Sequence, residues 1–192
     1  MQKTNDNHPE TKKHMTARVL TTCAILAAAS IVLSRLAGLM PNVSTRFSIE
    51  SVPVFLAGML FGPLPGALVG AVADFIGCLF SGYGFNPLFT VPPILYGISA
   101  GLFRRFVTDK PSVFRIGLAY LPPILLGSIL YQSWALAFVY GGKAFTSFFL
   151  TKLATRSVQF AITWVIETLL VYLLIKSKVF EKTHLIRRKA AG

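Results

Sequence analysis

Charged residues are scarce in this sequence, and acidic residues are the scarcest. The 192 residues include 7 Asp and Glu against 19 Lys and Arg, and charged residues make up only 14% of the chain, whereas soluble proteins average about 25%. Hydrophobic residues reach 54%, and the mean hydropathy is +0.63. A soluble domain of this length needs more charge on its surface, so the composition predicts an integral membrane protein.

Histidines and known catalytic motifs are missing from the apolar part of the chain, and its two cysteines are not expected to form a disulfide. All three histidines lie in the polar ends of the sequence, so we expect no metal site. Cys23 and Cys78 fall in apolar runs that the topology below places towards opposite membrane faces, and we expect no disulfide between them. The sequence also lacks a phosphate-binding P-loop, an HExxH helix and a nucleophile elbow. We therefore expect no catalytic residues and no cofactor in this chain.

Apolar runs separated by turn residues and charges make up most of what is present. They lie near 17–40, 49–62, 64–80, 87–106, 114–141 and 146–176. A single helix over 49–80 would be roughly 48 Å long at about 1.5 Å per residue, against a hydrocarbon core of about 30 Å. The segment Phe61-Gly62-Pro63-Leu64-Pro65-Gly66 supplies a turn that divides this stretch. The runs therefore predict six transmembrane helices.

The basic residues predict how these helices are oriented. With both chain ends in the cytoplasm, fourteen of the nineteen Lys and Arg residues lie on the inside, in agreement with the positive-inside rule. Because they flank apolar runs, we expect contact with membrane lipid and no binding of nucleic acid. We predict an all-α integral membrane protein, a compact bundle of six transmembrane helices over 17–178. A disordered cytoplasmic tail at 1–16 and a basic cytoplasmic tail at 179–192 would flank it.

Local signals predict details of individual helices. Asn86-Pro87 is typical of a helix start, with Asn as the cap and Pro in the first turn. Pro92-Pro93 and Pro122-Pro123 lie inside two of the runs, where each ring removes a backbone donor. Kinks are expected there, either for packing or for lining a cavity. Glycines spaced by four residues in the runs at 64–80 and 87–106 favour close helix packing over a functional role.

Five basic residues lie on the outside and depart from the charge bias. They are Arg35, Arg46, Lys143, Lys152 and Arg156. Such residues can snorkel to the interface or sit in water, an interpretation that we prefer for Lys143. Arg156 is harder to explain in this way, because it lies about a turn deeper than Lys152. The last run carries a polar stripe on one helix face, at Lys152, Arg156, Gln159, Thr163 and Glu167.

The run before it offers a matching polar face. It carries Ser128, Tyr131, Gln132 and Trp134. Gln132 lies roughly 14 Å from the outer end of its run and Gln159 roughly 17 Å from the start of the next, so the two amides are expected at similar depth. A cavity with cations at its mouth and with amides and aromatic rings below suits a ligand that joins carboxylates to a flat polar ring. Asp74 would act there either as a ligand-binding group or as an ion-pair partner of Arg35 or Arg156.

The run from Ile49 to Phe80 resembles the substrate-binding S-components of energy-coupling factor (ECF) vitamin transporters. The resemblance rests on Val52-Pro53 and on a Gly-Pro-x-x-Gly turn followed by Gly-x-x-x-Asp, which ends at Asp74. It extends over about residues 15 to 178. Two loop segments, Arg46-Phe47-Ser48-Ile49-Glu50 and Gly82-Tyr83-Gly84-Phe85-Asn86-Pro87, look most like the folate-specific members.

The resemblance implies a non-catalytic subunit in the bacterial cell membrane that captures folate on the outside. It would bind a transmembrane coupling subunit and two cytosolic ATPases, which would use the ATP. Small residues of the first helix pack against the coupling subunit in that family, a role that falls here on Ala24 and Ala28. The loops at 41–48 and 81–86 are implied to act as lids. The expected substrate-binding residues are then Arg35, Arg46, Phe47, Asp74, Tyr83, Phe85, Asn86, Tyr131, Gln132, Trp134, Lys152, Arg156 and Gln159.

Two other functions stay open. An S-component for another vitamin, such as riboflavin or pantothenate, would leave the five outside cations with less charge to neutralise. A stand-alone secondary transporter is disfavoured, because the 192 residues show no evident inverted repeat.

Overall fold

The part of the chain that the computed structural model describes comprises residues 17–38, 49–80, 85–109 and 111–177, and its regular structure is entirely helical. The elements are α1 (Ala17–Gly38), α2 (Ser51–Phe61), α3 (Pro63–Leu79), α4 (Pro87–Leu102), α5 (Arg104–Asp109), α6 (Val113–Pro122), the π-helix η1 (Pro123–Tyr131), α7 (Gln132–Tyr140), the short 3-10 helix η2 (Gly142–Ala144) and α8 (Phe145–Lys176). The all-helical prediction is confirmed for these residues. The predicted tails at 1–16 and 179–192 lie outside them.

The division of the apolar stretch 49–80 into two helices is confirmed. Gly62 adopts a φ of +106°, a conformation that residues with a Cβ rarely adopt, and its N–H donates to the carbonyl of Gly58 to end α2. Pro63 then begins α3, where its missing N–H costs no helical hydrogen bond. Ten of the eleven residues of α2 are buried, so this short helix is surrounded by its neighbours.

The predicted helix start at Asn86-Pro87 is also confirmed, but the predicted end near 106 is wrong. The Asn86 side chain accepts a hydrogen bond from the Leu88 N–H at 3.1 Å and caps α4. The helix ends at Leu102, a turn follows at Phe103, and the separate short helix α5 carries Arg104 and Arg105. The two exposed arginines lie on α5, beyond the apolar segment that packs in the bundle.

The two proline pairs behave differently. Pro92 and Pro93 lie inside α4, which continues through them without a break. Pro122 and Pro123 mark the point where α6 changes into the π-helix η1, which continues into α7. Adjacent prolines remove two successive backbone donors. A local change from the hydrogen-bond spacing of an α-helix to that of a π-helix accommodates the loss at Pro122 and Pro123.

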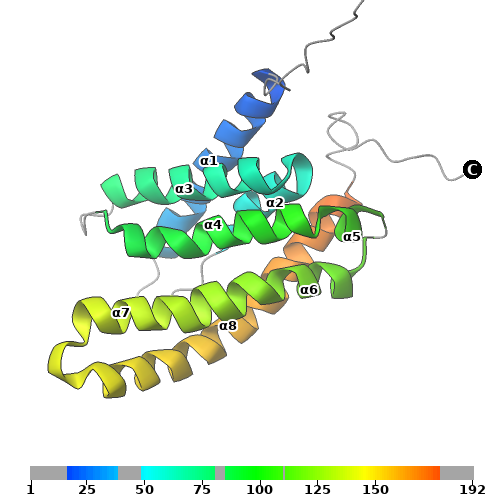
Figure 1. Ribbon diagram of the computed structural model, residues 1–192. Coiled ribbons are helices and arrows are strands. Elements are labelled where there is room, and N and C mark those ends of the chain that lie inside the picture. Colours follow the sequence, from blue (N-terminus) through cyan, green and yellow to red (C-terminus); the bar gives the residue numbers. More distant parts are fainter. Residues whose placement is uncertain (1–16, 39–48, 81–84, 110, 178–192) are drawn as a thin grey trace, which may run out of the picture.

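The glycines spaced by four residues pack helix backbones against each other, as predicted. A Cβ added at Gly66 would lie 2.6 Å from the Gly97 carbonyl oxygen, and one at Gly70 would lie 2.4 Å from the Pro93 carbonyl oxygen. Gly101 is equally close to Pro63, at 2.1 Å from its nitrogen. Figure 1 shows the result, with α3 and α4 side by side and α2 behind them.

Within the described residues, three helical stretches are long and apolar enough to cross a membrane. They are Val19–Leu36, Val113–Tyr140 and Gly142–Lys176. The apolar helices α2, α3 and α4 are shorter, with 11, 17 and 16 residues. The stretch formed by α6, η1 and α7 runs alongside α4, and α8 returns across it (Figure 1). These helices enclose the cavity described next.

Candidate ligand-binding cavity

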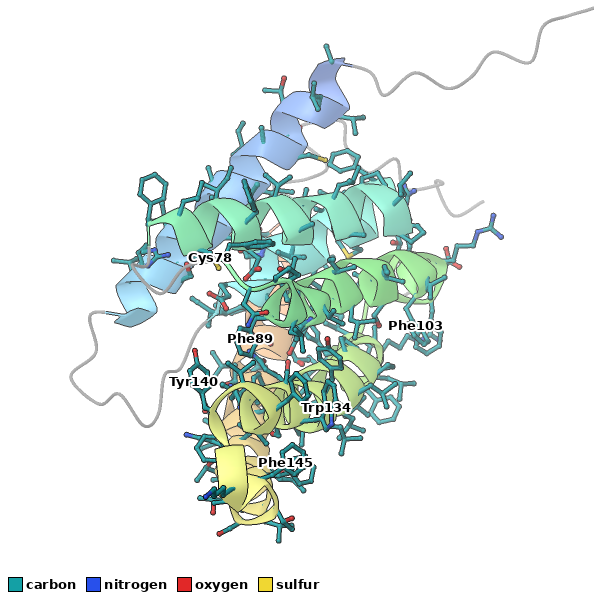
Figure 2. All side chains as sticks on the ribbon, turned by 60° about the vertical axis from the view of Figure 1, so that its left-hand side comes forward. Cys78, Phe89, Phe103, Trp134, Tyr140 and Phe145 are labelled. Atoms are coloured by element: carbon teal, nitrogen blue, oxygen red, sulfur yellow. The ribbon has the colours of Figure 1, made fainter. Side chains whose placement is uncertain are left out.

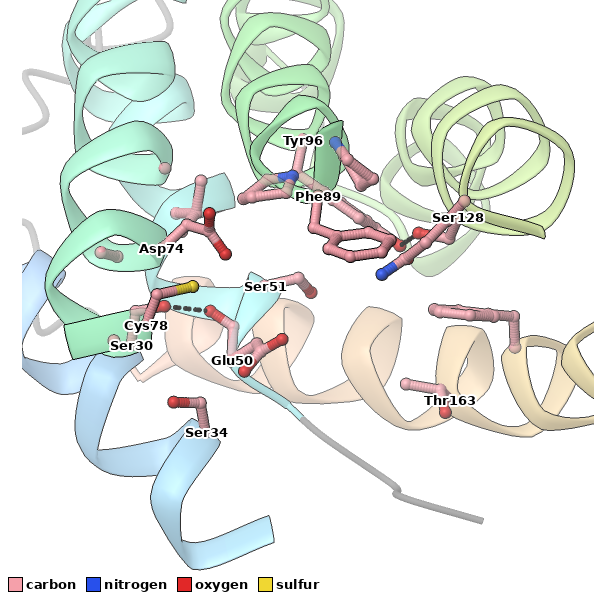
Figure 3. Close-up of a pocket in the computed structure, with 18 of the residues that line it drawn as sticks. Ser30, Ser34, Glu50, Ser51, Asp74, Cys78, Phe89, Tyr96, Ser128 and Thr163 are labelled. Atoms are coloured by element: carbon pink, nitrogen blue, oxygen red, sulfur yellow. Dashed lines mark hydrogen bonds between the residues drawn. The ribbon is translucent and has the colours of Figure 1, made fainter. Parts of the chain in front are cut away.

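A cavity of about 410 Å³ lies between the helices, with side chains from α1, α2, α3, α4, η1, α7 and α8 on its walls. Its polar lining residues are Ser30, Ser34, Arg35, Glu50, Ser51, Asp74, Cys78, Tyr96, Ser128, Gln132, Arg156, Gln159 and Thr163. Figure 3 shows the cavity from within, with Ser30, Ser34, Asp74 and Cys78 on one side and Ser128 and Thr163 on the other. Segments more than a hundred residues apart in sequence therefore share one site.

The wall formed by α1, α3 and the residue before α2 carries carboxyl groups, hydroxyl groups and one guanidinium. Asp74 Oδ2 accepts a hydrogen bond from Thr90 Oγ1 at 2.6 Å, which links α3 to α4. Ser30 Oγ donates to the backbone carbonyl of Glu50 at 2.7 Å, and this bond joins α1 to the residue before α2. The guanidinium of Arg35 donates to the carbonyl of Gly77. Hydrogen bonds between helices thus orient each of these polar groups.

The opposite wall carries a cation held by an amide. Arg156 on α8 donates through Nη1 to Gln132 Oε1 at 3.0 Å and to the Ser128 carbonyl at 3.4 Å. The Ser128 hydroxyl lies 3.0 Å from the Tyr96 hydroxyl of α4. The guanidinium also lies 5.8 Å from the centre of the Phe160 ring, within range of a cation–π contact. These contacts orient Arg156 before any ligand enters.

A buried carboxyl, that of Glu167, is hydrogen-bonded to the cavity residue Ser51. Glu167 is 2% exposed, and its Oε1 accepts a hydrogen bond from Ser51 Oγ at 2.5 Å. Among the described residues, its Oε2 finds no hydrogen-bond partner. Ser51 is the first residue of α2, so this bond joins the start of α2 to α8. Nearby, the ring of Tyr120 stacks on Phe55 with 4.0 Å between centroids.

Five of the predicted substrate-binding residues line this cavity together. They are Arg35, Asp74, Gln132, Arg156 and Gln159. Gln132 and Gln159 come from different helices and both line the cavity, while their similar depth in a membrane stays a prediction. In the described part of the chain, Asp74 pairs with Thr90 and forms no ion pair with Arg35 or Arg156.

Another five predicted residues lie outside the cavity lining. Phe85 contacts Phe75 edge-on at 5.1 Å, and Asn86 caps α4. Trp134 is 43% exposed, lies 6.0 Å from the Tyr131 ring and stacks on Phe138 at 5.5 Å. The ammonium group of Lys152 lies 5.4 Å above the Phe148 ring. A binding role for these five residues stays a prediction.

The remaining predicted residues fall elsewhere. Arg46, Phe47 and Tyr83 lie outside the described residues. Ala24 and Ala28 are exposed on the outer face of α1, while Cys23 and Ala27 on its other face are buried in the core. Two small exposed residues are therefore present where the partner contact was predicted, next to the exposed Ile25.

Several lining residues were not among the predicted set. Ser30 and Ser34 are spaced by four residues in the mainly apolar helix α1 and precede Arg35 on it, a signal that could have identified them. Tyr96 carries a polar group in a membrane segment and offered a similar signal. Phe89 and Phe160 gave none, because the sequence contains 16 phenylalanines and most apolar helix faces carry some.

Comparison with known proteins places this fold among transporter subunits. The family described as ECF transporter, substrate-specific component, matches residues 18–175. The folate transporter FolT of Clostridium novyi is 29% identical over 146 residues, which cover 75% of this chain and 82% of that protein. A UPF0397 protein of Streptococcus pneumoniae is 28% identical over 99 residues, or 52% of this chain and 54% of that protein. The crystal structure of FolT bound with folic acid superposes with a TM-score of 0.65 and 27% identity, covering 81% of this chain and 90% of that chain.

Proposed function

The chain belongs to the family of ECF transporter substrate-specific components, and from this we propose that it is the high-affinity folate-binding subunit of an ATP-driven vitamin importer. It captures folate from the extracellular side of a bacterial cell membrane. The observation that carries the proposal is the likeness to FolT bound with folic acid, at 27% identity over 81% of this chain and 90% of that one.

The cavity supports this proposal by its size and its chemistry. Its volume of about 410 Å³ lies in the range of about 300–1,000 Å³ that is usual for small-molecule sites. Arg156 and Arg35 supply charge for the glutamate carboxylates, and Gln132, which accepts a hydrogen bond from Arg156, holds that guanidinium in the cavity. Phe89 and Phe160 line the same space and offer flat apolar surfaces to an aromatic ligand.

The proposal includes a topology and a division of labour. The chain crosses the membrane six times with both termini in the cytoplasm, and it performs no catalysis and holds no cofactor of its own. A transmembrane coupling subunit docks on α1 near Ala24 and Ala28, and two cytosolic ATPases use the ATP. The exposed small residues of α1 support this docking face, because small side chains permit close helix approach.

Ligand binding by the purified full chain tests the substrate. Isothermal titration with folic acid is expected to give a dissociation constant in the nanomolar range, with riboflavin and pantothenate at least about a thousandfold weaker. Binding of riboflavin or pantothenate in preference to folic acid would reassign the chain to another vitamin.

Uptake separates the proposed subunit from a stand-alone transporter. Vesicles that contain the chain alone should accumulate no folate, whereas vesicles with the coupling subunit, the ATPases and ATP should. Ion-gradient-driven uptake by the chain alone would contradict the proposal. Ala28→Trp should block the ATP-driven uptake while changing folate affinity less than about twofold, because its bulk projects from the exposed face of α1.

A further inference from the structure

Two carboxylates line a cavity that, on the proposed function, receives a dianion. Asp74 and Glu50 both contribute to its walls. A carboxylate placed against the glutamate tail of folate would repel it, and the repulsion is strong where water is excluded. An acid that contacts the ligand in such a cavity therefore meets a different group of the ligand.

Asp74 is held by its surroundings and still faces the cavity. Thr90 Oγ1 donates to its Oδ2 at 2.6 Å, and α3 and α4 are locked together one turn away, where a Cβ on Gly70 would lie 2.4 Å from the Pro93 carbonyl oxygen. In the described part of the chain, neither Arg35 nor Arg156 pairs with this carboxylate. A carboxylate has about four acceptor sites, and Thr90 occupies one of them.

Folate chemistry offers one matching group. The 2-amino group and the N3–H of the pterin ring lie side by side on one ring edge and point their hydrogens in the same direction. A carboxylate accepts such a pair through two parallel hydrogen bonds, as it does from a guanidinium. The tail presents carboxylates, which Asp74 repels, and the N10–H and the amide N–H offer one donor each, so the ring edge is the group that can fill two acceptor sites of Asp74 at once.

We propose that Asp74, oriented by Thr90, accepts the two donors of the 2-amino-4-oxo ring edge and determines specificity for pterin-type rings. This inference rests on the proposed function. Phe89 precedes Thr90 on α4 and lines the same cavity, so its ring is placed to pack against the bound pterin. Figure 3 shows the Asp74 carboxylate and the Phe89 ring entering the cavity from α3 and α4. The carboxylate tail then extends away from Asp74, towards Arg156 on the opposite wall.

The test pairs a change in the ligand with a change in the protein. The purified full chain is titrated with folic acid and with an analogue in which a methyl group replaces the 2-amino group. The wild-type chain is expected to bind the analogue about 10- to 100-fold more weakly, as for the loss of a charge-assisted hydrogen bond. Asp74→Asn is expected to weaken folic acid by a similar factor and to reduce the difference between the two ligands to less than about threefold.

Glu50→Gln provides the matched control, because it neutralises the other acid of the cavity. It is expected to change the affinity for both ligands by the same factor, so that their ratio stays at the wild-type value. Thr90→Val keeps the carboxylate of Asp74 but removes the donor that orients it. It should lower the ratio of the affinities for folic acid and the analogue only in part. Thermal unfolding of each variant checks that it is folded.

Different results overturn different claims. If the wild-type chain binds both ligands equally, or Asp74→Asn weakens both by one factor, Asp74 only braces α3 against α4 and the specificity role is wrong. If Asp74→Asn does not fold, the wild-type ratio and Thr90→Val still decide the question. If the wild-type chain binds no folic acid, the proposed function fails, and the role of Asp74 with it.

Discussion

The two walls of the cavity are built in different ways. In the wall that contains α3, glycines bring the backbones of α2, α3 and α4 into direct contact, so that a Cβ on Gly97 would lie 2.2 Å from the carbonyl carbon of Gly66. The hairpin of α7 and α8 carries exposed aromatic side chains, among them Trp134, Phe138 and Tyr140. Figure 2 shows Trp134, Tyr140 and Phe145 gathered on this hairpin.

The wall that contains α3 is therefore rigid, because backbones contact each other, whereas the wall formed by α7 and α8 is held together by side-chain hydrogen bonds. Backbone contacts leave no room for adjustment, so the positions of Asp74 and Thr90 follow directly from the packing of α3 on α4. The other wall depends on individual hydrogen bonds, such as Arg156 to Gln132 and Trp164 Nε1 to the Gly117 carbonyl at 3.0 Å. The following variants probe the two walls, from the largest expected effect to the smallest.

Gly97→Val should damage the rigid wall most. The new side chain would collide with the backbone of Gly66, and we expect the free energy of unfolding to fall by about 3 kcal/mol or more. Thermal unfolding of the purified protein measures this loss. Gly77→Val is the matched control, because outside its own helix the nearest atom to a Cβ at this position is Arg35 Nη2 at 3.9 Å. Equal stability of the two variants would show that the glycine contacts do not hold this wall together.

Glu167→Ala should weaken the contact between the two walls, which is the hydrogen bond from Ser51 on α2 to Glu167 on α8. The change leaves Ser51 without its acceptor and opens a hole beside it, so we expect a loss of about 2–4 kcal/mol in the free energy of unfolding. Glu167→Gln keeps an acceptor and a similar shape, and should cost less than about 1 kcal/mol. The same unfolding assay compares them, and an alanine variant as stable as the glutamine variant would argue against this contact.

Arg156→Ala tests the wall that depends on side chains. We expect folate binding to weaken by about 1.5–3 kcal/mol, the value of a charge-assisted hydrogen bond, and the free energy of unfolding to fall by about 1–2 kcal/mol, because the hydrogen bond to Gln132 is lost. Titration calorimetry measures the affinity, and Lys143→Ala, on the exposed turn η2, is the control. Arg35→Ala should have a smaller effect, because Arg35 is more exposed. Unchanged affinity in both arginine variants would remove the cationic part of the proposed site.

Trp134→Leu should have the smallest effect. The ring stacks on Phe138 and is 43% exposed, away from the cavity lining. We therefore expect a change in folate affinity of less than about twofold in the same titration. A loss of tenfold or more would mean that the bound state brings Trp134 to the ligand, as the sequence analysis predicted.

Much of the fold was predictable from the sequence, because the signals involved are local. Long apolar runs identify helices, and Gly62-Pro63 and Asn86-Pro87 identify where helices end or begin. The π-helix after Pro122 was expected only as a kink. The end of α4 at Leu102 was missed, because the apolar pattern continues to Phe106 beyond the two arginines.

The site was predictable only in part. Polar residues such as Asp74, Gln132, Arg156 and Gln159 are conspicuous in apolar helices, and all four line the cavity. Aromatic residues carry no such contrast with their surroundings. Trp134 was therefore favoured by its type, whereas Phe89 and Phe160 were missed although they line the cavity.

The sequence by itself determined the helices, their apolar character and the few polar groups that must avoid lipid, because each of these depends on neighbouring residues in the chain. Only the tertiary structure decided which of those groups meet. Ser51 and Glu167 are separated by 116 residues, yet they share a hydrogen bond. Such pairs depend on how far each helix is rotated and how closely the glycines let the backbones approach, and both are properties of the packed bundle.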